Sequence, residues 1–207
     1  MSTKRRVGIL ISGGGSNMVA LLKAMVEPDF PAEPALVVSN NANAGGLAKA
    51  EAAGLPTRVL DHRPFKGDRA AYDATIDAAW RDAGVDLIAQ AGFMRIHDAA
   101  YVSAWEGRML NIHPSILPAF KGLNTHARAL QAGCAVHGCT VHEVVPELDS
   151  GRILGQAAVP VLAGDTPETL AARVLVQEHK LYPAVLRAYA EDPDAARAAP
   201  ISIFAEA

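Results

Sequence analysis

Val7-Gly8-Ile9-Leu10-Ile11-Ser12-Gly13-Gly14-Gly15-Ser16-Asn17 is the first segment of the chain whose side-chain pattern predicts regular structure. The apolar run at 7–11 predicts a buried strand, and apolar residues at helical spacing follow, namely Met18, Leu21, Leu22 and Met25. Glycines let a backbone approach a ligand closely, and a helix N-terminus offers unpaired N–H groups to an anion. Strand, glycine loop and helix in this order therefore predict a phosphate-binding loop, with a tight turn that binds no ligand as the alternative.

Two common kinds of phosphate loop do not fit. A Walker loop ends in Gly-Lys-Ser/Thr, and this loop has no lysine. A dinucleotide fingerprint needs a third glycine where Met18 stands. It also needs an acidic residue after the next strand, where the chain instead has Ser39-Asn40-Asn41. We therefore expect a phosphate ligand that is not part of a nicotinamide or flavin dinucleotide.

Strand and helix patterns alternate along the first half of the chain. We expect strands at 7–11, 35–38, 57–60, 86–91 and 109–113, and helices beginning near 16, 44, 69 and 99. This alternation predicts an α/β, Rossmann-like fold: a mostly parallel, twisted sheet with helices on both faces. Two further strands at 138–145 and 153–162 predict an antiparallel hairpin, and a long helix begins near 165. We expect one domain over 1–207, with halves at 1–110 and 111–190 and a tail at 191–207.

Ligands of parallel α/β sheets lie outside the carboxyl ends of the strands. The loops at 13–17, 92–96 and 111–115 each follow such an end, so we expect them to converge on one cleft. In the last of these, Asn111 and His113 are two residues apart on a strand that ends at Pro114. An amide donor beside a titratable imidazole suits a reaction in which an oxygen gains negative charge.

A catalytic histidine needs a partner that orients it or balances its charge. Asp149, in a glycine-flanked loop, is the candidate, although a turn aspartate without a catalytic role explains it equally well. Asp86 and Glu147 are the competing carboxylates. Ser115 lies close to His113, but no Gly-x-Ser-x-Gly elbow accompanies it, which disfavours a serine hydrolase.

The composition narrows the class of protein. The chain has 207 residues, a formal net charge of -3 and two cysteines. The charge disfavours nucleic-acid binding, no apolar segment is long enough for a bilayer, and two cysteines cannot build a disulfide framework. We therefore expect a cytoplasmic protein without nucleic-acid or membrane partners. Cys134, His137, Cys139 and His142 match no usual zinc spacing, so we expect no metal.

Five segments together resemble the phosphoribosylglycinamide formyltransferases, a family of folate-dependent formyltransferases. They are Ile11-Ser12-Gly13-Gly14-Gly15-Ser16-Asn17, Ala91-Gly92-Phe93-Met94-Arg95-Ile96, Asn111-Ile112-His113-Pro114-Ser115, Glu147-Leu148-Asp149-Ser150-Gly151, and Gln177-Glu178-His179 with Tyr182-Pro183. The resemblance covers nearly the whole chain. It implies transfer of a formyl group from 10-formyltetrahydrofolate to the amine of glycinamide ribonucleotide in purine synthesis, by a monomer or a homodimer.

The resemblance also implies roles for single residues. The catalytic residues would be Asn111, His113 and Asp149. The ribonucleotide would bind at Gly15, Ser16, Asn17 and Glu178. The folate would bind at Arg69, Met94, Arg95, Ile96, His97 and Asn111. We expect 1–110 to be the phosphate-binding half and 111–190 to be the catalytic and folate-binding half. Gly14 stands where the family often has a polar residue, and His97 stands where an apolar one is common.

Three other functions compete with this one. A 10-formyltetrahydrofolate hydrolase shares Asn111, His113 and Asp149 but usually carries a further N-terminal domain, whereas the first strand here begins at Val7. A methionyl-tRNA formyltransferase would need an RNA-binding C-terminal domain and a more basic chain. A non-enzymatic module that binds nucleotide phosphates is the alternative from another class.

Overall fold

The computed structural model describes residues 4–205, which form two compact units that meet in sequence between Asn111 and Ile112. The boundary falls inside strand β5 (Met109–His113). Whether the chain acts as the single domain predicted from the sequence stays a prediction. Within the described range, no helix is both long and apolar enough to cross a membrane.

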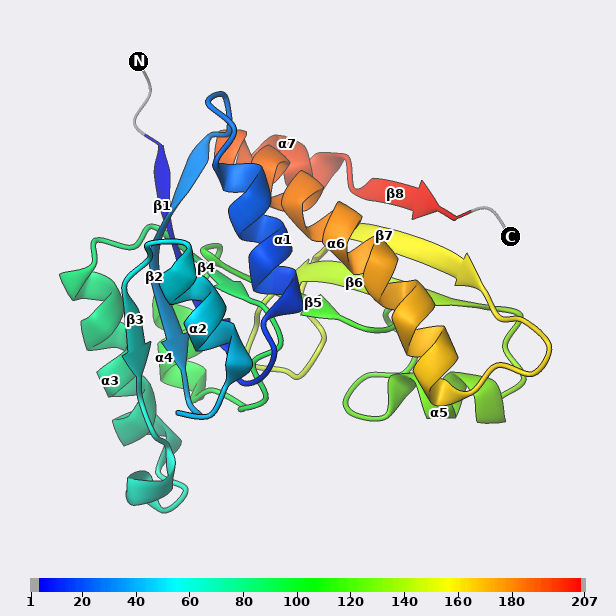
Figure 1. Cartoon of the computed structure of the whole chain (residues 1–207), viewed down its shortest axis with the longest axis horizontal. Coiled ribbons are helices and arrows are strands. Elements are labelled where there is room, and N and C mark those ends of the chain that lie inside the picture. Colours follow the sequence, from blue (N-terminus) through cyan, green and yellow to red (C-terminus); the bar gives the residue numbers. More distant parts are fainter. Residues whose placement is uncertain (1–3, 206–207) are drawn as a thin grey trace. The chain divides into compact units, whose positions relative to one another are not determined.

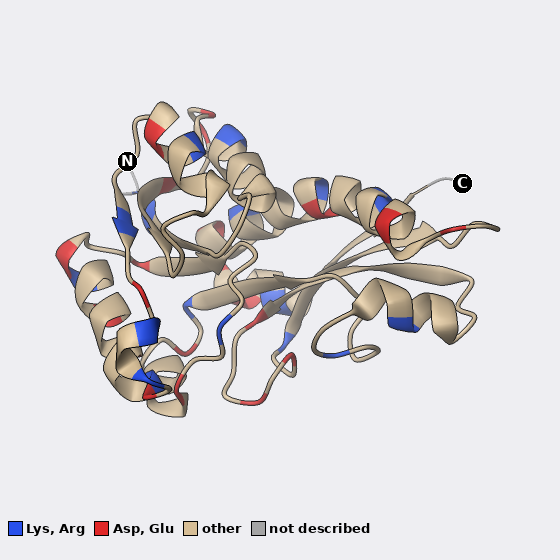
Figure 2. Ribbon diagram, turned by 60° about the horizontal axis from the view of Figure 1, so that its bottom comes forward, with Lys and Arg blue, Asp and Glu red and all other residues tan. Residues whose placement is uncertain are grey.

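The first unit is a parallel sheet with the strand order β3-β2-β1-β4-β5. Its other strands are β1 (Arg5–Ile11), β2 (Ala32–Ser39), β3 (Thr57–Val59) and β4 (Leu87–Gln90). Its helices are α1 (Ser16–Met25), α2 (Gly45–Ala52), α3 (Arg69–Asp82) and α4 (Ala99–Ala104), with a 3-10 turn at Arg63–Phe65. Helices α1 and α2 cover one face of this sheet, and α3 and α4 cover the other (Figures 1 and 2).

The core of the first unit forms around strand β1. The apolar side chains of β1 from Val7 onward are fully buried, as the apolar run predicted. The indole of Trp80, from α3, lies against Gly8, where an added Cβ would come within 2.7 Å of the ring. Glycine at this position therefore allows α3 to pack closely on the sheet. The Trp80 Nε1–H donates to the Tyr101 hydroxyl at 2.9 Å, which satisfies the polar atom of this buried indole.

The second unit is a three-stranded sheet covered by one long helix. Strands β6 (Val136–Glu143) and β7 (Ile153–Pro160) pair antiparallel, and β8 (Ile201–Phe204) pairs parallel to β7. Helix α6 (Pro167–Glu191) packs on these strands, and α5 (Thr125–Gln131) packs on α6. A Cβ at Gly155 would lie 2.7 Å from a methyl group of Val185, so this glycine allows α6 to approach β7. The hairpin and long helix confirm that part of the predicted α/β class.

The end of the described chain is more ordered than we expected. Beyond Asp192 we expected only a tail, whereas the structure forms helix α7 (Pro193–Ala198) and then β8. The Asp192 carboxylate caps α7 by accepting from two backbone N–H groups. Arg197 then donates to Glu143 Oε1 at 2.8 Å and joins α7 to the end of β6. A side-chain cap and an ion pair thus stabilise α7, although its sequence has no clear periodic pattern of apolar residues.

Candidate active site

The phosphate loop (residues 13–17) leads from β1 into α1, as predicted. Gly15 precedes the helix with φ 68°, a left-handed conformation that favours glycine. A Cβ there would lie 2.9 Å from the Gly46 Cα, so α2 sits directly against the loop. The Gly46 N–H also donates to Gly13 O at 3.0 Å. Among the described residues no side chain caps the start of α1, an arrangement suited to an anionic ligand.

Lys49 brings a positive charge to this loop. Its Nζ donates to Gly14 O at 2.8 Å from helix α2. Neither the Walker pattern nor the dinucleotide pattern includes this residue, because the lysine comes from the next helix and not from the loop. The signal in the sequence is a lysine in the last turn of the helix that begins with Gly45-Gly46.

Ser12 connects the phosphate loop to the segment that follows β4. Its backbone N–H donates to Gly92 O at 3.1 Å, and its Oγ accepts from the Met94 N–H at 2.8 Å. Two of the loops predicted to meet at the carboxyl ends of the strands are therefore bonded to each other within the first unit. The loop at 111–115 spans the boundary between the units.

The segment predicted to contact the folate (residues 94–97, called the folate segment below) combines exposed and buried side chains. Met94 is 68% exposed and Ile96 is 54% exposed, which is unusual for large apolar groups and suits a flat organic ligand. Arg95 between them is also exposed. Arg69, the other residue that the resemblance assigns to the folate, is the exposed first residue of α3, a helix that the Asp68 side chain caps.

His97 is placed differently from its neighbours. Its side chain is 4% exposed, and its ring stacks on Phe93 with the centroids 5.1 Å apart. The His97 Nδ1 lies 2.8 Å from Asp73 Oδ1, and the other oxygen of Asp73 accepts from the Asp98 N–H at 2.6 Å. Asp73 therefore holds the far end of the folate segment, while Ser12 holds its beginning.

In the second unit, His113 and Asp149 lie in direct contact. The His113 Nδ1 is 3.4 Å from Asp149 Oδ2, and both side chains are 7% exposed. The His113 Nε2 lies 3.0 Å from Phe120 O. Asp149 adopts φ 48° and accepts from the Gly122 N–H at 2.8 Å, which fixes the carboxylate beside the ring. Asn111 precedes His113 by two residues on β5, so the two side chains leave the same side of that strand.

Both ring nitrogens of His113 face acceptors. Nδ1 lies beside the Asp149 carboxylate, and Nε2 lies beside the Phe120 carbonyl. The carbonyl oxygen can only accept, so Nε2 carries an N–H that donates to it. The arrangement places a hydrogen-bond donor and a buried carboxylate on the same imidazole ring.

Three other histidines of this unit stay neutral near pH 7. Burial lowers the pKa of His137 to about 4 and also lowers the pKa of His126. The two rings contact through His137 Nε2 and His126 Nδ1 at 3.2 Å. Burial likewise lowers the pKa of His142, whose Nδ1–H donates to Glu143 O at 2.8 Å. His142 Nε2 also lies 3.8 Å from Asp149 Oδ1, so the second imidazole beside this carboxylate is a neutral one.

The competing residues of the sequence analysis have other partners. Asp86 accepts from the Arg6 N–H at 2.8 Å. Glu147 has a side chain that is 79% exposed and lies 3.8 Å from Lys121 Nζ. The Ser115 hydroxyl donates to Ala119 O at 2.6 Å and helps to shape the loop after β5. Of the three candidate carboxylates, Asp149 is the one in contact with His113.

Two further residues of the second unit, Glu178 and Asn124, belong to its helices. Glu178 is buried on α6, where its charge adds to the burial that raises the pKa of Cys139. Asn124 precedes α5 with φ 56°, and within the described chain its side chain makes no cap hydrogen bond, although asparagine is a common cap residue. Asparagine tolerates this left-handed backbone conformation, which lets the chain turn into α5.

A family model described as formyl transferase matches residues 5–186 of the chain. Phosphoribosylglycinamide formyltransferase of Escherichia coli (strain K12) is 44% identical over 183 residues, covering 88% of this chain and 86% of that protein. The trifunctional purine biosynthetic protein adenosine-3 of Bos taurus is 50% identical over 89% of this chain, but the chain spans only 18% of its length.

Solved structures agree with these matches. The crystal structure of phosphoribosylglycinamide formyltransferase from Brucella melitensis has 54% sequence identity and a TM-score of 0.86, covering 91% of this chain and 96% of that one. A glycinamide ribonucleotide transformylase 1 from Symbiobacterium toebii has 44% identity and a TM-score of 0.88. With a family model over most of its length and full-length relatives well above 30% identity, the chain belongs to the formyl transferase family, among the phosphoribosylglycinamide formyltransferases.

Proposed function

We propose that this chain transfers the formyl group of 10-formyltetrahydrofolate to the amine of N1-(5-phosphoribosyl)glycinamide, a step of purine synthesis. The observation that carries the proposal is the His113 ring, held between the Asp149 carboxylate and the Phe120 carbonyl on the strand that also carries Asn111. The full-length relatives are named for this activity.

The reaction begins with attack of the glycinamide amine on the formyl carbon, which gives a tetrahedral oxyanion. The Asn111 amide and the His113 imidazolium donate to this oxygen. His113 Nε2 lies 3.0 Å from Phe120 O, so its N–H turns its hydrogen bond from that carbonyl to the oxyanion while the proton stays on the nitrogen. The carbon–nitrogen bond to the folate then breaks, and the proton lost by the attacking amine ends on the departing folate nitrogen.

Asp149 has two tasks in this mechanism. Its charge stabilises the imidazolium at 3.4 Å, and the Gly122 N–H keeps the carboxylate in that position. As a base it accepts the proton of the attacking amine, directly or through water, and returns it to the leaving nitrogen.

The remaining predicted residues bind the two substrates. Gly15, Ser16 and Asn17 bind the phosphoribosyl part together with Lys49, whose ammonium lies at the phosphate loop. Glu178 holds the glycinamide ribonucleotide. Arg69, Met94, Arg95, Ile96 and His97 contact the folate, with the exposed side chains of Met94 and Ile96 as its apolar support.

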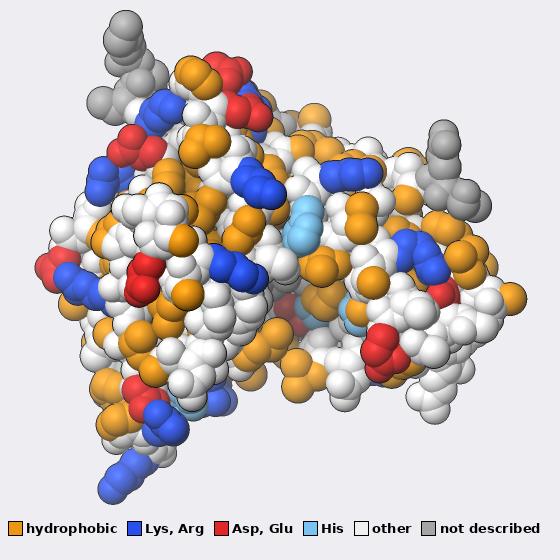
Figure 3. Space-filling view, in the orientation of Figure 1, with side chains coloured by type: hydrophobic (Ala, Val, Ile, Leu, Met, Phe, Trp, Pro, Cys, Tyr) orange, Lys and Arg blue, Asp and Glu red, His pale blue; other side chains and the backbone are white. Residues whose placement is uncertain are grey.

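The test compares acceptors. Purified protein is given 10-formyltetrahydrofolate with glycinamide ribonucleotide or with water alone, and formylated ribonucleotide and free formate are both measured. Formylated product is the expected result. Formate release without the ribonucleotide would identify a hydrolase, and ligand binding without turnover would identify a binding module. Figure 3 shows acidic and basic side chains interspersed on the face that it draws.

A cytoplasmic location, and a monomer or homodimer as the active form, stay predictions from the sequence. Size-exclusion chromatography with light scattering distinguishes the two oligomeric states.

A further inference from the structure

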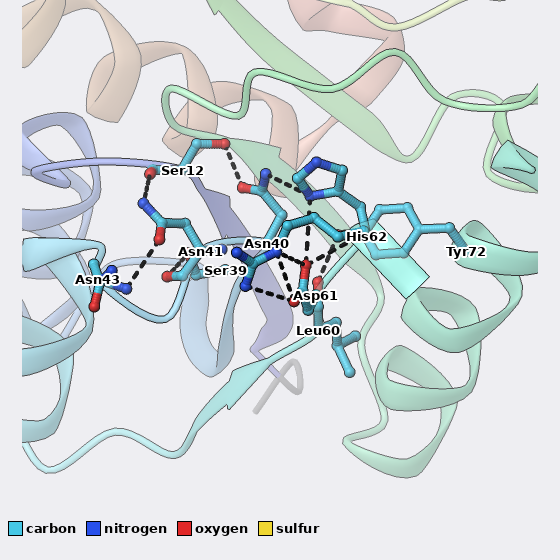
Figure 4. Close-up of polar contacts among 10 residues, drawn as sticks. Ser12, Ser39, Asn40, Asn41, Asn43, Leu60, Asp61, His62 and Tyr72 are labelled. Atoms are coloured by element: carbon cyan, nitrogen blue, oxygen red, sulfur yellow. Dashed lines mark hydrogen bonds and ion pairs between the residues drawn. The ribbon is translucent and has the colours of Figure 1, made fainter. Parts of the chain in front are cut away.

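A chain of side-chain hydrogen bonds runs away from the phosphate loop across the ends of β1, β2 and β3. The Ser12 hydroxyl donates to Asn40 Oδ1 at 2.7 Å, and Asn40 Nδ2 lies 3.4 Å from His62 Nδ1 (Figure 4). Asn40 is buried, directly after β2, and His62 follows β3. Neither residue has a role in the site described above.

The donor and acceptor roles along this series of hydrogen bonds follow from Ser12. The Met94 backbone N–H can only donate, so Ser12 Oγ accepts from it at 2.8 Å. The Ser12 hydroxyl must then give its own proton to Asn40 Oδ1, which turns the Asn40 amide N–H toward His62. In this direction His62 Nδ1 accepts, which requires the tautomer with the ring proton on Nε2. The Asp61 carboxylate is beyond hydrogen-bond distance of the same nitrogen, with Oδ1 4.0 Å from Nδ1.

His62 is itself fixed by its surroundings. Its ring packs edge-on against Tyr72 with the centroids 6.2 Å apart, and the Tyr72 hydroxyl donates to Leu60 O at 3.0 Å. Asp61, the neighbour of His62, forms an ion pair with Arg63 at 2.7 Å and caps the Arg63 N–H. The end of the hydrogen-bond chain is thus attached to α3 and to the turn after β3 (Figure 4).

We propose that Asn40 and His62 are positioning residues for the formyl donor: they set the rotamer of Ser12, and Ser12 sets the position of the folate segment through Met94. This inference rests on the proposed function, because it assigns the donor to residues 94–97. Asp73 already fixes the other end of that segment through His97 and Asp98. With both ends fixed, the exposed side chains between them are preorganised for the donor, which reduces the ordering cost of binding.

The first measurement is independent of turnover. Hydrogen exchange at the Met94 amide is followed in the ligand-free protein, where the bond to Ser12 protects it. Asn40→Ala and His62→Ala should accelerate this exchange several-fold, whereas Asn43→Ala should not. Asn43 is a matched control, since it is an exposed asparagine of the same loop. Its backbone N–H donates to Asn41 Oδ1, a bond that the alanine variant keeps. Unchanged Met94 exchange in both test variants would overturn the proposal.

The second measurement uses kinetics and a pair of isosteres. Loss of one neutral hydrogen bond should raise KM for 10-formyltetrahydrofolate about 3- to 10-fold in His62→Ala, with kcat within about twofold of the wild type. His62→Asn places an amide oxygen near the position of Nδ1 and should restore the wild-type KM. His62→Gln places its oxygen farther out and should not. Equal KM values for the asparagine and glutamine variants, both polar and of similar size, would contradict the proposed role.

These outcomes separate this inference from the proposed function. If Met94→Ala leaves the donor KM unchanged, the assignment of the folate segment fails. If Met94→Ala raises that KM but the Asn40 and His62 variants change neither KM nor exchange, only the positioning role fails.

Discussion

Replacing Asp149 by asparagine tests the electrostatic core of the mechanism. The substitution keeps the size of the side chain and an oxygen for the Gly122 N–H, but it removes one buried negative charge 3.4 Å from His113 Nδ1. The charge of each group is spread over several atoms, so an effective separation of about 5 Å is appropriate. At an effective dielectric constant of about 20, the lost attraction is about 3 kcal/mol.

Loss of this attraction should mainly raise the energy of the transition state. The imidazolium is needed most when the oxyanion forms, so Asp149→Asn should lower kcat by about two orders of magnitude and change each KM by less than about threefold. The assay is the initial rate of formyl transfer, with each substrate varied at saturation of the other, on protein whose melting temperature has been compared with that of the wild type.

Glu147→Gln is the matched control for this variant. It removes the same charge from the same loop, but the Glu147 side chain is 79% exposed and pairs loosely with Lys121 at 3.8 Å. Water and salt screen such a charge, so kcat should stay within about twofold of the wild type. The reasoning is refuted if Asp149→Asn keeps more than a third of wild-type kcat, or if Glu147→Gln loses as much activity.

Three further predictions address other parts of the molecule. Asn111→Ala removes an oxyanion donor and should lower kcat about 100- to 1000-fold with little change in KM, as measured in the same assay. Lys49→Gln should raise KM for the ribonucleotide about 3- to 10-fold and weaken its salt dependence, whereas Lys23→Gln at the far end of α1 should not; equal effects would exclude a local role for Lys49. Burial lowers the pKa of His137 to about 4 in the folded chain, so between pH 6.5 and pH 4 the unfolded chain binds a proton that the folded chain does not. The stability of the folded chain therefore falls as the pH is lowered through this range. His137→Gln should reduce the loss of unfolding free energy between pH 7 and pH 4.5 by at most about 3 kcal/mol, as measured in denaturant titrations at both pH values.

The elements with strong periodic patterns were predictable from the sequence. Helix α1 buries Met18, Leu21 and Leu22, the residues of the predicted stripe, because one face of a surface helix must pack on the sheet. A cap such as Asp68 at the start of α3 is also readable from the sequence, since it depends on a neighbour three residues away. Helix α7 and strand β8 were not predicted, because they are short and depend on tertiary contacts such as the bond from Arg197 to Glu143.

Local sequence could place His113 at the end of a strand, but it could not select the partner carboxylate. Asp86, Glu147 and Asp149 were equally acceptable by residue type. Register and exposure decide between them: the turn between β6 and β7 turns one carboxylate inward against the ring and leaves the other in water. Such a choice depends on the backbone path of a whole loop, including a left-handed residue at Asp149, and no short motif specifies it.

The Ser12–Asn40–His62 chain shows why a site residue can escape a motif search. Each of these side chains follows a different strand, and each is unremarkable in its own segment: a serine before glycines, an asparagine in a loop, a histidine before an arginine. Parallel strands bring their carboxyl ends to one edge of the sheet, so residues far apart in sequence become hydrogen-bond partners there. The phosphate loop and the folate segment are then joined through Ser12, and a change at His62 reaches Met94 without touching either substrate. Substitutions at the ends of β2 and β3 should therefore affect the donor side of the reaction, an effect that the substrate-contacting residues alone would not predict.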